Sequence, residues 1–139
     1  MDTSFLVSLY VLDANSARAA EQMKQVRFPV FLTPLSELEL TNAILLRLFR
    51  RELVASRIKS ALALIRADVE NGIFLQRPMP PGTYERAKQV ARRWSSKLGT
   101  RTLDILHVAS AVILRAEAFY TFDRVQEKLA RAVGLKVAQ

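Results

Sequence analysis

The sequence predicts an α/β fold in which helices cover a parallel sheet. Short β-like runs alternate with longer segments of helical periodicity along the chain, and this alternation is typical of parallel strands joined by helices. The chain has 139 residues, of which 50% are hydrophobic. That is the usual size of one domain with one core. We therefore expect a single domain over residues 1–139.

The first elements are short. A mainly apolar segment, Thr3 to Leu12, opens the chain and ends in a turn over residues 13–16. An amphipathic helix is expected from there to about Val26. Residues 28–32 read as a strand, with Pro29 near its start, where a missing N–H is tolerated.

The next helix has a clear predicted start. Ser36 and Glu39 have the S-x-x-E spacing of a capping box, and Leu35 and Leu40 stand at hydrophobic-staple positions. We expect this helix to run to about Arg51.

Another helix follows and ends at Asn71-Gly72, since glycine is favoured just past a helix end. Its apolar face is formed by Val54, Ile58, Ala61, Leu62, Ile65 and Val69. Residues 73–75 are then a brief strand. The proline-rich residues 78–82 form a connector that is too short to separate two domains.

Two further helices are predicted after this connector. The first ends at Gly99 and carries an apolar stripe of Tyr84, Ala87, Ala91, Trp94 and Leu98. Thr102 is expected to cap the second, which runs from Leu103 to about Ala118 and is apolar on nearly every side. A helix of that composition is expected to be buried.

The chain is expected to end with a strand, a helix and a strand. Residues 119–122 and 135–137 are the strands, and the helix between them covers residues 123–133 and stops at Gly134. No repeat or low-complexity segment interrupts the pattern.

Composition restricts the possible chemistry. The chain has no cysteine, which excludes disulfides, thiolate metal sites, iron–sulfur clusters and thiol catalysis. His107 is the only histidine, so a metal would be held by oxygen atoms, as Mg²⁺ and Mn²⁺ prefer. The formal net charge of +8 favours a polyanionic partner, whether RNA, DNA, an acidic protein or a membrane surface.

Targeting signals are not apparent. No apolar run approaches the roughly 20 residues that a bilayer requires. No basic segment precedes an apolar stretch at the N-terminus. We therefore expect a soluble, cytoplasmic protein that does not bind membranes.

Four acidic residues stand where a strand gives way to a helix or in the first turns of a helix: Asp2, Glu39, Asp104 and Asp123. In an open parallel sheet, ligands bind outside the carboxyl ends of the strands, so acids from separate units can converge there. Each acid also has a purely structural interpretation, because a carboxylate near a helix start is favoured by the helix dipole or acts as a cap. Gln126, three residues after Asp123, is placed to return a capping bond.

The surroundings of Asp104 favour a functional interpretation. Its helix is otherwise rich in Leu, Ile, Val and Ala, and only His107 and Ser110 continue a polar stripe from it. Burying a carboxylate beside such a helix is costly without a partner charge. A bound cation would remove that cost.

Four motifs resemble those of the PIN domain family. They are Asp2-Thr3-Ser4, Glu39 followed by Asn42-Ala43, Asp104-Ile105-Leu106-His107, and Thr121-Phe122-Asp123-Arg124 leading into Gly134-Leu135-Lys136-Val137. The resemblance spans the chain in order and with suitable spacing. Within the family, the E-x-x-N-A and D-x-x-H details are most similar to VapC-type ribonuclease toxins of type II toxin–antitoxin systems.

The resemblance implies a three-layer α/β/α sandwich with a mostly parallel sheet of about five strands. It also implies Mg²⁺- or Mn²⁺-dependent cleavage of RNA phosphodiester bonds. Asp2 and Asp104 would be the principal metal ligands, and Glu39 and Asp123 would complete the catalytic acids. Supporting roles would fall to Thr3, Ser4, Asn42, His107 and Thr121.

Two details of this assignment stay open. His107 is either a general acid or base or, as we favour, a packing or positioning residue. Family members usually have several strand residues before the first acid, whereas only Met1 precedes Asp2 here. Either the first strand is short or the chain begins later than its relatives, and the rigidity of Asp2 depends on which.

Basic residues form two groups that are expected to contact RNA phosphates. The first group surrounds Trp94, which we assign to the core, and consists of Arg86, Lys88, Arg92, Arg93, Lys97 and Arg101. From this group we assign RNA binding to Arg92, Arg93, Lys97 and Arg101. The second group is Arg47, Arg50, Arg51, Arg57 and Lys59. Ordinary surfaces mix charges of both signs, so this excess is informative.

Partners are also expected. Leu45, Leu46, Leu48 and Phe49 make the helix after Glu39 apolar over more than one face, which suits the core, a groove for an antitoxin helix, or a homodimer. The leading hypothesis is a toxin ribonuclease with a cognate antitoxin. The alternatives are a PIN nuclease of RNA processing or decay, and a catalytically inactive RNA- or protein-binding module.

Overall fold

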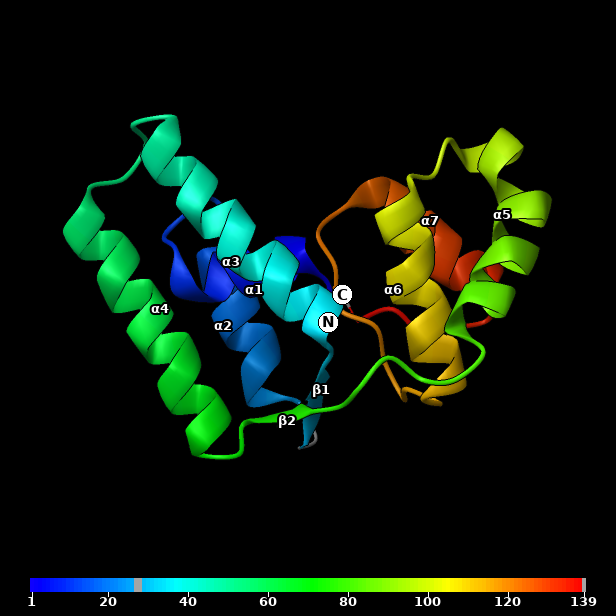
Figure 1. Cartoon of the computed structure of the whole chain (residues 1–139), viewed down its shortest axis with the longest axis horizontal. Coiled ribbons are helices and arrows are strands. Elements are labelled where there is room, and N and C mark those ends of the chain that lie inside the picture. Colours follow the sequence, from blue (N-terminus) through cyan, green and yellow to red (C-terminus); the bar gives the residue numbers. More distant parts are fainter. Residues whose placement is uncertain (27–28, 139) are drawn as a thin grey trace. The chain divides into compact units, whose positions relative to one another are not determined.

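The computed structural model describes residues 1–26 and 29–138. In chain order its elements are α1 (Thr3–Tyr10), α2 (Ser16–Lys24), β1 (Val30–Leu32), α3 (Pro34–Phe49), α4 (Ala55–Glu70), β2 (Phe74–Gln76), α5 (Thr83–Leu98), α6 (Thr102–Ile113) and α7 (Arg124–Ala132) (Figure 1). None of the helices in these ranges is both long enough and apolar enough to cross a bilayer.

The chain forms two compact units. The first contains Met1 and Thr3–Arg77, and the second contains Asp2 and the chain from Pro78 onward. Each unit has its own hydrophobic core. The expectation of one domain over residues 1–139 stays a prediction.

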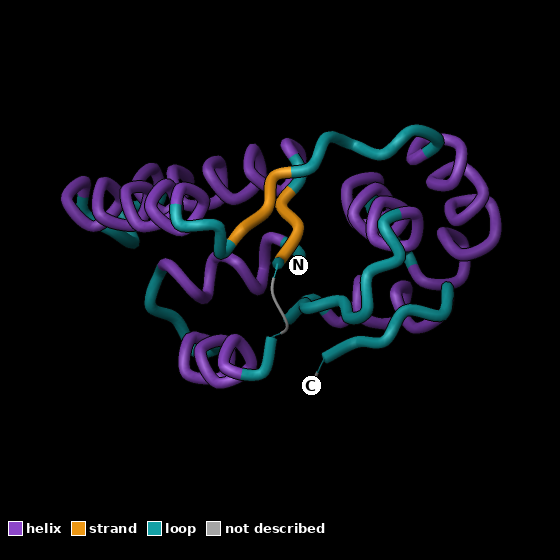
Figure 2. The backbone as a smooth tube through the Cα atoms, turned by 90° about the horizontal axis from the view of Figure 1, so that it is seen from below, coloured by secondary structure: helices purple, strands orange, loops and turns teal. Residues whose placement is uncertain are grey.

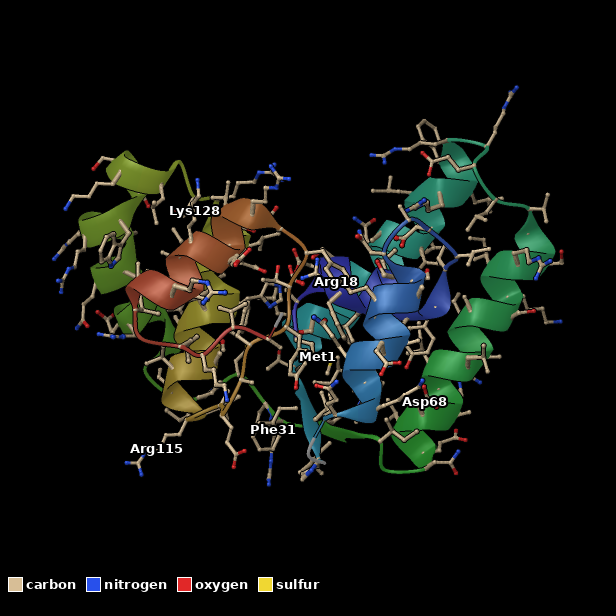
Figure 3. The ribbon with its side chains drawn as sticks, turned by 180° about the vertical axis from the view of Figure 1, so that it is seen from behind. Met1, Arg18, Phe31, Asp68, Arg115 and Lys128 are labelled. Carbon is tan, nitrogen blue, oxygen red and sulfur yellow. The ribbon has the colours of Figure 1, made fainter. Side chains whose placement is uncertain are left out.

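The first unit is built on a pair of parallel strands. β1 pairs with β2, with Val30 opposite Phe74 and Leu32 opposite Gln76, and Figure 2 shows the two strands side by side. Helices α1, α3 and α4 supply most of the rest of this unit's core, which includes Leu6 and Ile44. The Tyr10 hydroxyl of α1 donates a 2.6 Å hydrogen bond to Asp68 of α4, which Figure 3 labels.

The second unit is a group of three helices. α6 packs against both α5 and α7, and its core residues Val108 and Ala109 are fully buried together with Leu129 and Ala130 of α7. An isolated parallel bridge joins Phe119 to Val137.

The two predicted C-terminal strands are reduced to this bridge, and a sheet of about five strands is not confirmed. The described residues contain two paired strands and one isolated bridge. In this bridge the Phe119 N–H donates to the Lys136 carbonyl and the Phe119 carbonyl accepts from the Ala138 N–H, whereas the Tyr120 carbonyl accepts from the backbone N–H of Asp2. The parallel pairing of β1 with β2 agrees with the predicted α/β class. Residue 28, the start of the predicted first strand, lies outside the described residues.

Several predicted helix limits are corrected. The apolar opening segment is helix α1, which starts directly after Asp2. The α3 helix is capped by Thr33, whose side chain accepts from the Ser36 N–H, so the predicted Ser36–Glu39 capping box is wrong. Pro34 follows this cap at the first helical position, where its missing N–H has no cost.

The predicted extent of α6 is also wrong at both ends. The helix includes Thr102, which we expected to be its cap, and Arg101 holds the cap position. It ends at Ile113 and not near Ala118. Arg115 adopts a left-handed conformation with φ 52°, and its N–H and that of Ala116 bond carbonyls of the last turn. This is a Schellman ending with arginine where glycine is usual.

Candidate active site

A chain of hydrogen bonds in the second unit joins two of the predicted catalytic acids. The Thr121 hydroxyl donates to Asp2 Oδ2 at 2.9 Å, and Thr121 Oγ1 accepts from the Asp123 backbone N–H at 3.0 Å. Asp2 is 4% exposed and Thr121 is 7% exposed. The structure therefore brings together a carboxylate at one end of the chain and a threonine and an aspartate near the other.

Asp2 is held at its backbone as well as at its side chain. Its N–H donates to the Tyr120 carbonyl at 3.0 Å, and its carboxylate accepts from Thr121. Tyr120 was not among the predicted site residues, and no sequence signal marks it because the contact uses only its main chain. These two bonds fix the position of Asp2.

Asp123 is the cap of α7, as expected. Its Oδ1 accepts from the N–H groups of Val125 at 2.7 Å and Gln126 at 2.9 Å. The expected return bond from the Gln126 side chain is absent, because the Asp123 N–H donates to Thr121. Gln126 is 1% exposed, and its Oε1 has no hydrogen-bond partner among the described residues.

Asp104 also bonds its own helix start. It is half-buried, and its Oδ2 accepts from the Arg101 N–H at 3.1 Å. His107, one turn later, is buried, as is Ser110, whose hydroxyl donates to the Leu106 carbonyl. The predicted polar stripe is thus an internal feature of the second unit.

Glu39 lies in the first unit and accepts a 2.9 Å hydrogen bond from the Thr3 hydroxyl. Because Thr33 caps α3, Glu39 is not needed as a capping residue. Thr3 follows Asp2 directly in the sequence. Ser4 contributes its carbonyl to the Ser8 hydroxyl, and Asn42 is exposed on α3.

The predicted RNA-binding residues lie on α5 and in the turn after it. Arg92, Arg93, Lys97 and Arg101 are all exposed. The guanidinium of Arg93 and the ammonium of Lys97 each lie 5.3 Å from the centre of the Trp94 ring. Trp94 itself is half-buried and packs against the core, as expected, whereas Tyr84 is 66% exposed and does not belong to that core.

Within residues 1–26 and 29–138, no group of three or more acidic or histidine side chains stands close enough together to hold a metal ion. Asp2, Thr121 and Asp123, which hydrogen bonds connect, all carry side-chain oxygen atoms.

Comparison with known proteins identifies the family. A family model described as the PIN domain matches residues 1–132. No curated protein matches the chain. Since the family match covers nearly the whole sequence, the chain belongs to the PIN domain family, whose members are α/β proteins, are generally nucleases and typically use divalent metals.

Proposed function

We propose that this protein is a ribonuclease that requires Mg²⁺ or Mn²⁺ and uses Asp2, Glu39, Asp104 and Asp123 as its catalytic acids. The observation that carries the proposal is the Thr121 hydroxyl that links Asp2 to Asp123. Asp2 is 4% exposed, and burying a carboxylate costs free energy that the hydrogen bond from Thr121 offsets only in part. Asp2 is held at both its backbone and its carboxylate, which suits a residue that must keep a fixed position for catalysis.

The donor set fits a hard divalent cation. Carboxylate and hydroxyl oxygens are the ligands that Mg²⁺ and Mn²⁺ prefer. A cage of three or more side chains is not required, because Mg²⁺ is usually bound by one or two carboxylates and keeps waters and substrate phosphate as its other ligands. We assign Asp2 and Asp104 as the principal metal ligands. The bound ion would lower the pKa of a water and offset charge on the phosphate.

The protein's own residues keep this site rigid. Thr121 orients Asp2 by donation, and Thr121 is itself fixed because it accepts from the Asp123 N–H. Glu39 is assigned to the catalytic acids by the resemblance of its motif to the PIN domain family, and the Thr3 hydroxyl donates to its carboxylate. Ser4, Asn42, His107 and the pair Thr3 and Thr121 are assigned supporting roles.

RNA as the substrate is supported by the charge of the surface. The net charge is +8, and Arg92, Arg93, Lys97 and Arg101 are exposed. We assign these four residues to phosphate contacts. Because Arg93 and Lys97 lie over Trp94, the ring is covered and the contacts there are electrostatic rather than base stacking.

We further propose that the ribonuclease is the toxin of a toxin–antitoxin pair with a cognate antitoxin protein. The support is the likeness of the Glu39 and Asp104 motifs to VapC-type toxins. Growth arrest on expression, relieved by the product of a small adjacent reading frame, is the expected result. Cleavage without growth arrest would favour a PIN nuclease of RNA processing or decay.

The decisive experiment compares RNA cleavage by the wild type, Asp104→Asn and Asp104→Ala. Wild-type cleavage should cease in excess chelator and return with Mg²⁺ or Mn²⁺. Asp104→Asn keeps an oxygen for the Arg101 N–H, so it should be inactive while its thermal stability stays near that of the wild type. Asp104→Ala should be inactive and also less stable. Undiminished cleavage in excess chelator, or an active Asp104→Asn, would overturn the proposal.

A further inference from the structure

The turn between α3 and α4 exposes an aromatic ring. Phe49, the last residue of α3, is 82% exposed, and no other ring or cation packs against it among the described residues. Val54, which begins α4, is 64% exposed. Exposing a phenylalanine at a turn gains nothing for folding, because it leaves a large apolar area in water.

The same turn is strongly basic. Residues 47–59 contain five cationic side chains and one carboxylate, that of Glu52. Arg47 is paired with Glu52 at 3.3 Å, whereas Arg50 and Arg51 are exposed and form no salt bridge within the described residues. Figure 3 shows side chains with nitrogen tips extending outward from this turn.

The backbone of the turn adds a further observation. Arg51 has φ 59°, and the N–H groups of Arg51 and Glu52 bond carbonyls of Leu48 and Arg47. This is a Schellman ending with arginine at the left-handed position. The chain places glycine at the equivalent position after α4, α5 and α7. A non-glycine residue costs roughly 1 kcal/mol in this conformation, so an arginine here is kept at a cost to stability.

We propose that the α3–α4 turn is a binding surface for unpaired RNA, in which a base stacks on Phe49 and phosphates contact Arg50 and Arg51. An exposed aromatic side chain beside cationic groups is the combination that binds single-stranded nucleic acid. Only unpaired bases offer a free face for stacking. The choice of RNA rests on the proposed ribonuclease function. The turn belongs to the first unit, whereas Trp94, whose ring is already covered by Arg93 and Lys97, belongs to α5 of the second unit.

The start of α4 is compatible with bound phosphate. Its cap position is Val54, which provides no side-chain acceptor for the first N–H groups, and its first turn contains no acidic residue. Arg57 and Lys59 are exposed near this start. Phosphate that approaches Arg50 and Arg51 would therefore meet no opposing carboxylate from the first turn of α4.

The test measures RNA binding by the full chain in excess chelator, so that cleavage does not interfere. The probes are a fluorescent single-stranded RNA of about a dozen nucleotides and the same sequence as a duplex. Phe49→Ala should weaken single-strand binding by about 5- to 100-fold and leave duplex binding unchanged. Phe49→Trp should bind as the wild type does, and Phe49→Leu should behave as Phe49→Ala, because leucine is apolar but cannot stack.

Arg51→Gly provides a second variant that is not expected to unfold. Glycine suits the left-handed position, so the turn is preserved while a charge is removed. The log–log salt dependence of single-strand binding should flatten by about 0.7. Arg115→Gly is the matched control, since Arg115 has the same backbone conformation after α6. It should leave binding unchanged.

Several results would overturn this inference. Wild-type affinity of Phe49→Ala for the single strand, or an equal loss for duplex, would exclude base stacking. A dimer that becomes monomeric in Phe49→Ala would show that a second copy covers the turn. If Phe49→Ala lost binding to anionic vesicles but kept its binding to RNA, the turn would instead be a membrane-binding surface. Failure of the wild type to cleave RNA would refute the proposed function and leave this binding result intact.

Discussion

Replacing Thr121 with valine tests whether one buried hydroxyl holds the site together. Valine has nearly the shape of threonine but can neither donate to Asp2 nor accept from the Asp123 N–H. Those two bonds are 2.9 and 3.0 Å long, and Thr121 is 7% exposed. The substitution therefore removes both interactions with little change in packing volume.

The expected loss of stability follows from the two bonds. A hydrogen bond to a charged group contributes about 1.5–3 kcal/mol, and an unsatisfied buried N–H costs about 1–3 kcal/mol. The added methyl group of valine returns less than about 1 kcal/mol. The free energy of unfolding of Thr121→Val should thus be lower by about 2–4 kcal/mol. Thr121→Ser keeps the hydroxyl and loses one methyl group, so it should lose only about 1 kcal/mol.

Urea unfolding followed by circular dichroism, in chelator, measures this difference without a metal contribution. With a slope of about 1–3 kcal/mol per molar urea, the midpoint of Thr121→Val should lie about 1 M or more below that of the wild type. RNA cleavage should fall further in Thr121→Val than in Thr121→Ser. A Thr121→Val midpoint equal to or above that of Thr121→Ser would refute the assigned role of the hydroxyl.

Three other predictions address capping, the basic face and a buried phenol. Asp123→Ala should lower the free energy of unfolding by about 1 kcal/mol while Asp123→Asn stays near the wild type; equal midpoints for the two in urea would contradict the cap. Arg92→Ala combined with Arg93→Ala should weaken RNA binding for all sequences and flatten its log–log salt dependence by up to about two units, and wild-type behaviour at every salt concentration would show that these arginines are only solvated. Burial and then a hydrogen bond to a carboxylate raise the pKa of Tyr10 above its ordinary 10.0. As the pH rises, the unfolded chain therefore loses the Tyr10 proton before the folded protein does, so the free energy of unfolding should fall above pH 10.0. The fall should be less steep in Tyr10→Phe. Parallel pH profiles of the two proteins would argue against this pKa shift.

Helix ends show what local sequence can predict. Gly72, Gly99 and Gly134 all adopt positive φ after helices, as their placement predicts. Arg51 and Arg115 form the same kind of ending but carry no glycine signal. The predicted end of the helix from Leu103 was wrong for this reason, because nothing in a run of helix-forming residues indicates where the backbone reverses.

The start of α3 shows how two local signals compete. Thr33-Pro34 and Ser36-x-x-Glu39 both resemble helix starts, and the structure uses the first. Proline decides between them, because it fits the first helical turn and leaves Ser36 already inside the helix. The wrong capping box bears on function, because it assigned Glu39 to capping the start of α3, whereas Thr33 caps this helix.

The candidate site depends on pairings that spacing cannot predict. Asp2 and Thr121 are 119 positions apart, and no periodicity connects residues at such a distance. The resemblance to the PIN domain family predicts that both residues belong to one site. It did not identify the Tyr120 carbonyl, because a main-chain acceptor leaves no trace in residue type.

For Asp104 and Asp123, helix capping and cation binding are not mutually exclusive roles. A carboxylate has two oxygens, and in Asp123 both capping bonds go to Oδ1, while Oδ2 accepts no hydrogen bond among the described residues. Asp104 likewise uses only Oδ2 for the Arg101 N–H. A cap bond fixes one oxygen and thereby orients the other, so capping is compatible with binding a cation and favours it by restricting the side chain. Substitution of the aspartate by asparagine separates capping from cation binding, since asparagine keeps the accepting oxygen and removes the charge. A helix-capping aspartate should therefore be weighed as a candidate ligand whenever its second oxygen has no partner.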